Sequence, residues 1–172
     1  MKQTQPSPVS TESTRSYAWT DPAALLPVLA VTAGADYVSG IGDGTIPPPP
    51  IAQTLGFGSL RLVDGAAVLD LEPQPFHDNP IGSMHGGVIA TILDTVTGCA
   101  VHATLPPGAG YTSLDLAVRF IRAVRPGRGM ITATGRVVHR GARTAVAEAS
   151  LVDSAGRLIA TATSTCLLID AS

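Results

Sequence analysis

One helical segment among six strand-like runs is the feature of this sequence that most limits its fold. Apolar residues recur at helical spacing over residues 88–105, and Pro106-Pro107-Gly108 ends that pattern. Two strand-like runs precede the helix, and four follow it. Because the connections between the later runs are short, we expect these strands to pair antiparallel. The order favours an α+β fold in which a curled antiparallel sheet packs against one helix.

Turn residues give the limits of the strand-like runs. Asp64-Gly65 favours positive φ at both central positions of a tight turn, so it predicts a β-hairpin between residues 58–63 and 66–72. The four later runs cover residues 111–124, 130–138, 143–152 and 157–169. In the first of these, apolar and polar residues alternate from Ser113 to Phe120, which predicts that one face of that strand is buried.

The part of the chain ahead of the hairpin differs in composition. Residues 1–18 are rich in Ser, Thr, Gln and Pro and predict a flexible tail. Residues 19–46 predict a helical and loop extension, and the glycines and prolines of residues 40–50 indicate a loop. A length of 172 residues suits one folded domain. We place that domain at residues 47–172.

The composition bears on assembly and location. Charged residues make up 14% of the chain, whereas roughly a quarter is usual, and a surface with few charges tends to associate. We therefore expect an oligomer. No apolar run reaches the roughly 18 residues of a membrane helix, and no basic leader precedes the apolar residues 23–33, so we expect a cytoplasmic protein without membrane association. Cys99 and Cys166 predict two buried free thiols.

Basic residues are concentrated in the last third of the chain. Residues 1–118 hold ten acids and three bases, whereas the remainder holds three acids and eight bases. Seven arginines lie between positions 119 and 143 with no acid among them, namely Arg119, Arg122, Arg125, Arg128, Arg136, Arg140 and Arg143. Such a stretch favours phosphate. Phe120 is the only aromatic residue there, so a small phosphorylated ligand fits better than nucleic acid.

Asp94 is the only formally charged residue between Asp78 and Asp115. It lies opposite the apolar stripe of the expected helix, yet its neighbours on that side are small or apolar. We therefore expect this helix to be covered on both sides. A covered carboxylate is costly unless it is hydrogen-bonded or used, so Asp94 is a candidate general base or nucleophile, with a structural hydrogen bond as the alternative.

His85-Gly86-Gly87 leads into the same helix. Glycines let the backbone approach a ligand, and free N–H groups at a helix start carry partial positive charge that suits a developing oxyanion. The alternative is a plain glycine-rich loop. Gly86 and Asp94 are eight residues apart, which in a helix is a rise of about 12 Å. A dimer would shorten this separation by supplying Asp94 from the partner's helix.

Several other catalytic signatures are absent from the sequence. Ser83 lies in IGSMHGG and not in a G-x-S-x-G elbow, and neither a Walker A nor a G-x-G-x-x-G motif occurs. His77, His85, His102 and His139 lack the spacing of zinc ligands. No metal and no redox cofactor is therefore expected.

The segment NPIGSMHGGVIATILD covers the loop and the start of the helix. Together with the hairpin before it and SLDL in the first of the later strands, this segment resembles a known family. The resemblance is to hotdog-fold acyl-CoA thioesterases of the phenylacetate-pathway (PaaI-type) branch, and it covers residues 47–169. It implies a curled sheet wrapped around one long central helix. It also implies hydrolysis of an acyl-CoA thioester to a free acid and coenzyme A, by homodimers that commonly pair into homotetramers.

The resemblance also implies roles for matching residues. Asp94 would act as nucleophile or general base, and the Gly86 N–H would polarise the thioester carbonyl. Asn79 would orient the water or the thioester, and His85 would help to hold the loop. Ser113 would assist the water.

Further matching positions would bind substrate. Thr112 is an alternative to Ser113 because the length of the preceding loop is uncertain in sequence. Gly87 would let the backbone approach the substrate, and Arg140 and Arg143 would meet the nucleotide of coenzyme A. Coenzyme A is then part of the substrate, and no separate cofactor is implied.

Two rival functions remain at this point. An (R)-specific enoyl-CoA hydratase shares the fold, and its G-D-x-N-P-[LIV]-H signature is partly matched. Here Asp78 directly precedes Asn79, no histidine follows Ile81, and Asp94 would have no role. The second rival is a non-catalytic acyl-CoA-binding subunit, against which the presence of Asp94 argues.

Overall fold

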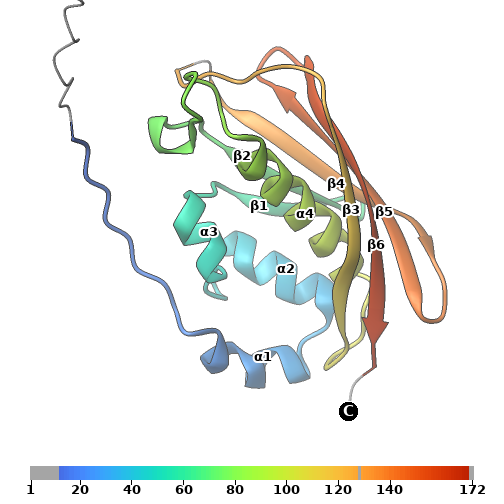
Figure 1. Ribbon diagram of the computed structural model, residues 1–172. Helices are drawn as coiled ribbons and strands as arrows, with labels where there is room; N and C mark the ends of the chain where they lie inside the picture. Colours follow the sequence, from blue (N-terminus) through green and yellow to red (C-terminus); the bar gives the residue numbers. More distant parts are fainter. Residues whose placement is uncertain (1–11, 128, 171–172) are drawn as a thin grey trace, which may run out of the picture.

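Within residues 12–127 and 129–170, which the computed structural model of the chain describes, six antiparallel strands form one curled sheet. The strands are β1 (Leu60–Val63), β2 (Ala66–Leu71), β3 (Gly110–Phe120), β4 (Ile131–Arg140), β5 (Thr144–Asp153) and β6 (Leu158–Ile169). Their order is β1-β2-β4-β5-β6-β3, so β1 and β3 are the two edges. The long helix α4 (Gly86–His102) lies against the concave face (Figure 1). The expected α+β hotdog fold is confirmed.

The β1–β2 hairpin forms as the sequence predicts. Val63 pairs with Ala66 across a turn in which Asp64 has φ of 50° and Gly65 has φ of 75°. Both values lie in the left-handed region that a two-residue hairpin turn requires.

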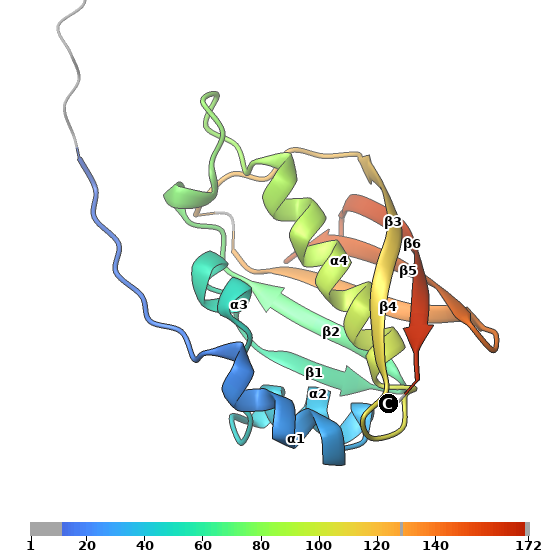
Figure 2. The same cartoon turned by 60° about the horizontal axis from the view of Figure 1, so that its bottom comes forward.

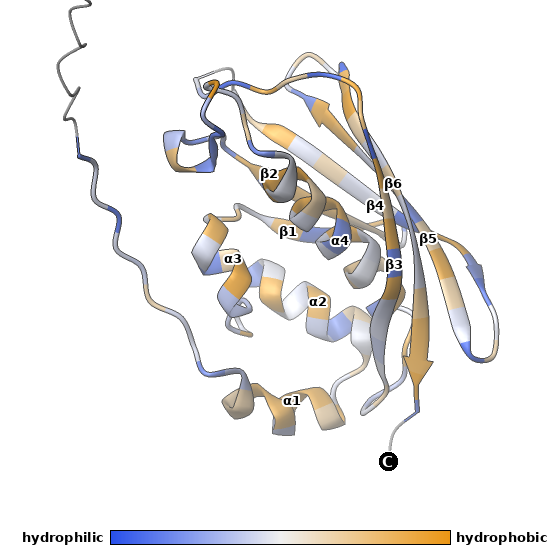
Figure 3. Ribbon diagram, in the orientation of Figure 1, coloured by the Kyte–Doolittle hydropathy of each residue, from blue (hydrophilic) through white to orange (hydrophobic). Residues whose placement is uncertain are grey.

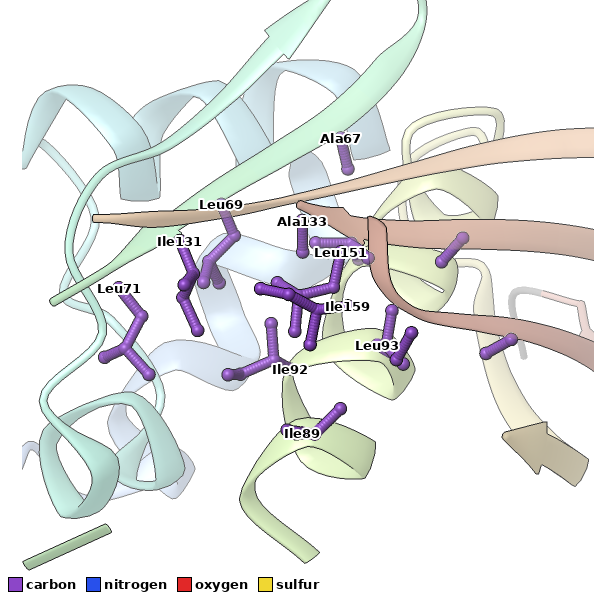
Figure 4. Packing of buried hydrophobic residues seen from close by; sticks show 14 of the residues in the cluster. Ala67, Leu69, Leu71, Ile89, Ile92, Leu93, Ile131, Ala133, Leu151 and Ile159 are labelled. Atoms are coloured by element: carbon purple, nitrogen blue, oxygen red, sulfur yellow. The ribbon is translucent and has the colours of Figure 1, made fainter. Parts of the chain in front are cut away.

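The core lies between α4 and the concave face of the sheet. Figure 4 shows Ile89, Ile92 and Leu93 on the side of α4 that faces the strands. Ile92 and Leu93 are fully buried against side chains such as Leu151 and Ile159. Burial of each such side chain contributes roughly 1.5–3 kcal/mol of hydrophobic free energy, which holds α4 on the sheet.

Helix α4 begins two residues earlier than the apolar spacing predicts. His85 precedes the helix, and its Nδ1 accepts a hydrogen bond of 2.9 Å from the Gly87 N–H, so it caps one of the free amide groups of the first turn. The helix ends at His102, ahead of Pro106-Pro107, rather than at residue 105. Both glycines of the motif are thus the first residues of the helix.

The regular alternation expected for β3 is interrupted by a β-bulge. Ser113 pairs with Cys166 and Asp115 pairs with Thr165, which leaves Leu114 as an extra residue. The bulge changes which side chains share a face, so Ser113 lies on the α4 side together with Leu116 instead of opposite to it. Leu114 and Phe120 are 58% and 57% exposed, so the prediction of a buried apolar face is wrong at these two residues, whereas Leu116 and Val118 pack against the core.

Short helices of the N-terminal extension lie beside α4 and β1 (Figure 2). They are a 3-10 turn (Pro22–Leu25), α1 (Leu26–Val31), α2 (Gly34–Asp43) and α3 (Pro50–Leu55), whose C-cap is Gly56. The expected loop over residues 40–50 is wrong for its first four residues, which belong to α2, and for Pro50, which begins α3. Glycines in α2 permit close contact, because a Cβ at Gly34 would lie 1.8 Å from the His102 carbonyl oxygen.

The described end of the N-terminal tail has no regular secondary structure, but one side chain attaches it to α3. Arg15 donates hydrogen bonds to the carbonyl oxygens of Thr54 and Gln53, and its guanidinium lies 4.1 Å from the centre of the Phe76 ring. The remainder of the predicted flexible tail, residues 1–11, lies outside the described residues. Figure 3 shows that α1 is largely apolar. No helix in the described part of the chain is long and apolar enough to cross a membrane.

Candidate active site

Asp94 and Ser113 meet in one chain. Ser113 Oγ on β3 donates a hydrogen bond of 3.1 Å to Asp94 Oδ1 at the middle of α4. Thr112 is the neighbouring residue on β3, is exposed, and has no side-chain hydrogen bond among the described residues. The structure thus brings Ser113, and not Thr112, to the carboxylate. Within a single chain Asp94 is half-buried, so one chain alone does not cover it on both sides.

Tyr111 is a third residue near the carboxylate, and the sequence patterns did not single it out. A Cβ at Gly98 would lie 2.2 Å from the Tyr111 hydroxyl oxygen, so the phenol occupies the space left by this glycine. Gly98 is one helical turn after Asp94 and on the same side of α4. Burial, together with the nearby thiols of Cys99 and Cys166 and the Asp94 carboxylate, raises the pKa of the Tyr111 phenol. In the sequence, the glycine in the middle of the predicted helix is the one sign that a large side chain packs closely against it.

The N-terminus of α4 has a free donor. The Gly86 N–H meets no acceptor among residues 12–127 and 129–170, whereas the Gly87 N–H is bonded to His85. Gly86 lies in a hollow of about 300 Å³ with Met84, Ile89 and residues 120–123. The hollow therefore contains a helix N-terminus with an unused N–H, and such a donor can bind an anionic oxygen.

The loop before α4 is held by its own side chains. Asn79 Oδ1 accepts from the Ile81 N–H at 3.0 Å and from the Ser83 N–H at 3.3 Å, and its Nδ2 donates to Ser83 Oγ at 3.0 Å. The His85 N–H donates to the His77 carbonyl oxygen. Asn79 is thus engaged within the loop that precedes α4, and its side-chain partners among the described residues all belong to that loop.

His77 is buried and structural. Its Nδ1 accepts from the Gln74 N–H at 3.0 Å, and its Nε2 lies 2.7 Å from the Leu55 carbonyl oxygen, which ties the loop to α3. Burial lowers the pKa of this imidazole below its ordinary 6.5, against an opposing effect of the Leu55 carbonyl. The neutral ring therefore fits its two hydrogen bonds.

The two halves of the site lie far apart in one chain. Gly86 and Asp94 belong to one continuous helix, so the rise between them is about 12 Å. The first half, with Gly86, lies near Phe120 at one end of β3. The second half, with Asp94 and Ser113, lies near the other end.

The arginines divide between these two halves. The β4–β5 turn carries Arg140 and Arg143, both exposed. Thr144 pairs with Leu167, which pairs with Thr112, so this turn lies at the Asp94 end of the sheet and two strands away, roughly 10 Å.

Other arginines lie near Gly86. Arg122 lines the Gly86 hollow, and with Arg125 and Arg157 it also lines a neighbouring hollow of about 360 Å³. Arg157 is paired there with Asp153 at 2.7 Å. Arg128 lies outside the described residues.

The cysteines form no disulfide. Cys166 is buried and Cys99 is partly buried, and both are free. Burial and the Asp94 charge raise the pKa of the Cys99 thiol to about 12, so it is protonated at neutral pH. Within the described part of the chain, no three His, Cys, Asp or Glu side chains are grouped so that they could hold a metal ion.

Comparison with known proteins agrees with this geometry. The family model described as Thioesterase superfamily matches residues 81–160, which include α4 and β3. A phenylacetic acid degradation-related protein from Ralstonia eutropha JMP134, provisionally named a thioesterase, has a solved structure that is 34% identical with a TM-score of 0.69. That match covers 76% of this chain and 98% of the other.

Two curated relatives are also similar. Acyl-coenzyme A thioesterase 13 of Homo sapiens is 29% identical over 107 residues, which are 60% of this chain and 75% of the relative. A Halobacterium salinarum protein, provisionally named an esterase, is 41% identical over 76 residues, which are 43% of this chain and 48% of that relative. The second match therefore spans about half of the relative's length.

The fold and these matches define the class of protein as a thioester hydrolase with a hotdog fold. The chain belongs to the thioesterase superfamily, as the loop and helix motif of residues 79–94 indicates.

Proposed function

We propose that the protein hydrolyses acyl-CoA thioesters to a free acid and coenzyme A, in an active site built from two subunits. The observation that carries this proposal is the pair formed by Asp94 and Ser113, 3.1 Å apart on α4 and β3. The name of the human relative, an acyl-coenzyme A thioesterase, supports the substrate class. The exposed Arg140 and Arg143 supply positive charge for the phosphates of coenzyme A.

Asp94 either activates or supplies the oxygen atom that attacks the thioester carbon. As a general base it takes a proton from water while the water oxygen bonds to the thioester carbon. As a nucleophile it bonds to that carbon itself and forms a mixed anhydride, which water then hydrolyses. In both routes the C–S bond breaks and the thiolate of coenzyme A leaves. The Ser113 hydroxyl donates to Asp94 Oδ1, which fixes the carboxylate or helps to place the water.

The Gly86 N–H stabilises the oxyanion. The carbonyl oxygen gains negative charge as its carbon becomes tetrahedral, and a preorganised N–H at a helix N-terminus favours that charge. The absence of an acceptor among the described residues leaves this N–H available. His85 holds the adjacent Gly87 N–H, and Asn79 keeps the preceding loop in shape. These two residues thus position the donor.

A homodimer brings the two halves together. A separation of about 12 Å is too long for one carbonyl group to reach both Asp94 and Gly86 of one chain. Among the described strands β3 pairs with β6 alone, so its other edge is free to pair with a second copy. Leu114 and Phe120 are 58% and 57% exposed on that strand. Antiparallel pairing of two β3 strands places the Asp94 end of one copy beside the Gly86 end of the other.

Two substitutions test these roles separately. Asp94→Asn keeps the shape and the hydrogen bond from Ser113 but removes the base, so we expect thiol release from a panel of CoA esters to fall at least a hundredfold. Gly86→Pro removes the N–H at the first helical position, where proline is tolerated, and His85 already has the extended φ of −64° and ψ of 136° that proline requires before it.

Gly86→Ala is the matched control for the second substitution. It adds a Cβ that would lie 3.2 Å from the tip of the Phe120 ring, which is exposed and can move, and it retains the N–H. We expect kcat to fall about a hundredfold or more with Gly86→Pro and within threefold with Gly86→Ala. Hydrolysis by Asp94→Asn above a tenth of wild type, or equal activity of the two Gly86 variants, would contradict the assignment.

A further inference from the structure

A second cavity lies on the other flank of α4. It has a volume of about 130 Å³ and opens between α2, α3, β1 and α4. Thr95 and Cys99 form its α4 side, and Ile41, Pro48 and Pro49 form its outer wall. No Asp, Glu, Lys, Arg or His is among its lining residues, in contrast to the hollow that holds Arg122 and Asp153. The cavity thus suits an uncharged apolar group.

The cavity is next to the proposed catalytic carboxylate along the chain. Thr95 directly follows Asp94, so their Cα atoms are about 3.8 Å apart and their side chains leave the helix roughly 100° apart. Ser113 contacts Asp94 from the β3 side, whereas the cavity lies where α4 faces α2, α3 and β1. An acyl group whose carbonyl carbon is at Asp94 therefore enters the cavity by passing over Thr95.

The N-terminal extension makes the outer wall rigid. A Cβ at Gly42 would lie 2.0 Å from the Leu60 carbonyl oxygen, so α2 packs on β1 with no space between the backbones and holds Ile41 in place. Pro48 and Pro49 have fixed φ angles. This wall lies outside residues 81–160, which match the family model. The N-terminal extension thus supplies the outer wall of the cavity.

The volume limits what can bind. An engineered cavity of about 150 Å³ in another protein holds one benzene molecule. We infer that this cavity is the acyl pocket, and that the substrate carries a compact, uncharged acyl group the size of one aromatic ring or a short branched chain. The inference rests on the proposed function. It makes Ile41 and Cys99 specificity-determining residues and excludes long-chain and carboxylated acyl groups.

Binding of non-hydrolysable thioethers tests this inference without the need for turnover. S-benzyl-CoA and S-dodecyl-CoA are titrated into the full chain by calorimetry. We expect the Kd of the benzyl thioether to be at least tenfold lower. Ile41→Ala enlarges the cavity from α2 and should reduce the ratio of the dodecyl Kd to the benzyl Kd at least fivefold. Cys99→Met fills the cavity from α4 and should weaken benzyl binding at least fivefold. Ser39→Ala, on the exposed side of α2, is the control and should leave both constants unchanged.

The outcomes separate the two proposals. If neither thioether binds, the proposed function fails. If both bind but the dodecyl compound binds as tightly as the benzyl compound, or if Ile41→Ala and Cys99→Met leave the ratio within twofold, the acyl-pocket inference fails and the proposed function stands. Thermal unfolding identifies a variant that does not fold. Because the two substitutions lie on different walls of the cavity, the variant that folds still tests the acyl-pocket inference.

Discussion

Gly98→Ala tests the contact that joins the start of β3 to α4 beside the proposed catalytic carboxylate. An alanine in a helix interior is normally about 1 kcal/mol more favourable than glycine. Here the added Cβ would lie 2.2 Å from the Tyr111 hydroxyl oxygen and 2.8 Å from Cζ. Tyr111 is partly buried and packs against a cluster that includes Val101 and Cys166, so its ring cannot simply turn into solvent. Overpacking costs roughly 1–3 kcal/mol, and a contact as short as 2.2 Å belongs to the upper part of that range. After the gain of about 1 kcal/mol from alanine, we expect a net loss of about 1–2 kcal/mol.

The assay is thermal unfolding of wild type, Gly98→Ala, Tyr111→Phe and the double variant. A loss of about 1–2 kcal/mol corresponds to a Tm lower by roughly 3–6 °C for a domain of this size. Tyr111→Phe removes the atom nearest to the new Cβ, so the double variant should recover at least half of that loss. A Gly98→Ala protein at least as stable as wild type would refute this account, because it would show that the phenol does not fill the space at Gly98.

Three further predictions concern other parts of the molecule. Arg140→Ala combined with Arg143→Ala should raise KM for CoA esters about tenfold or more and leave KM for pantetheine esters within twofold; equal effects would place these side chains away from the nucleotide. Gly135→Ala should lower Tm steeply in thermal unfolding, because its Cβ would lie 2.3 Å from the Val96 carbonyl oxygen, and an unchanged Tm would contradict that close packing. Burial lowers the pKa of His77 below 6.5 in the native state, so the unfolded chain binds more protons as the pH falls through 6.5; the free energy of unfolding should therefore decrease from about pH 7 to about pH 5, and His77→Gln should reduce that slope.

Much of the fold follows from local sequence patterns. Asp64-Gly65 specifies its hairpin because the turn needs two positive φ angles, which the structure contains. The apolar stripe that includes Ile92 and Val96 predicts the central helix because the same residues face the sheet. The separation of Gly86 and Asp94 follows from helical rise alone, so their spacing in the sequence already supports the proposal of a site shared between two subunits.

The features that the sequence did not predict depend on tertiary contacts. Helix α2 contains Gly34, Gly40 and Gly42, which lower helix propensity. Gly34 and Gly42 allow close contact with the His102 and Leu60 carbonyl groups, and this packing favours the helix. The bulge at Leu114 moves Ser113 to the α4 face, and no alternation of apolar and polar residues indicates such an insertion. The sequence could therefore suggest Ser113 through family resemblance but could not separate it from Thr112 by its pattern.

Mixing two inactive variants tests most directly whether each site takes its base and its oxyanion donor from different subunits. The Asp94→Asn and Gly86→Pro variants are unfolded together, refolded, and assayed against each variant refolded alone. In a hybrid dimer one of the two sites has an intact Asp94 and an intact Gly86 N–H, and random mixing makes half of the dimers hybrids, so activity should return to about a quarter of wild type. Activity that stays at the mean of the two inactive proteins, although hybrids are present by native mass spectrometry, would contradict a site shared between subunits.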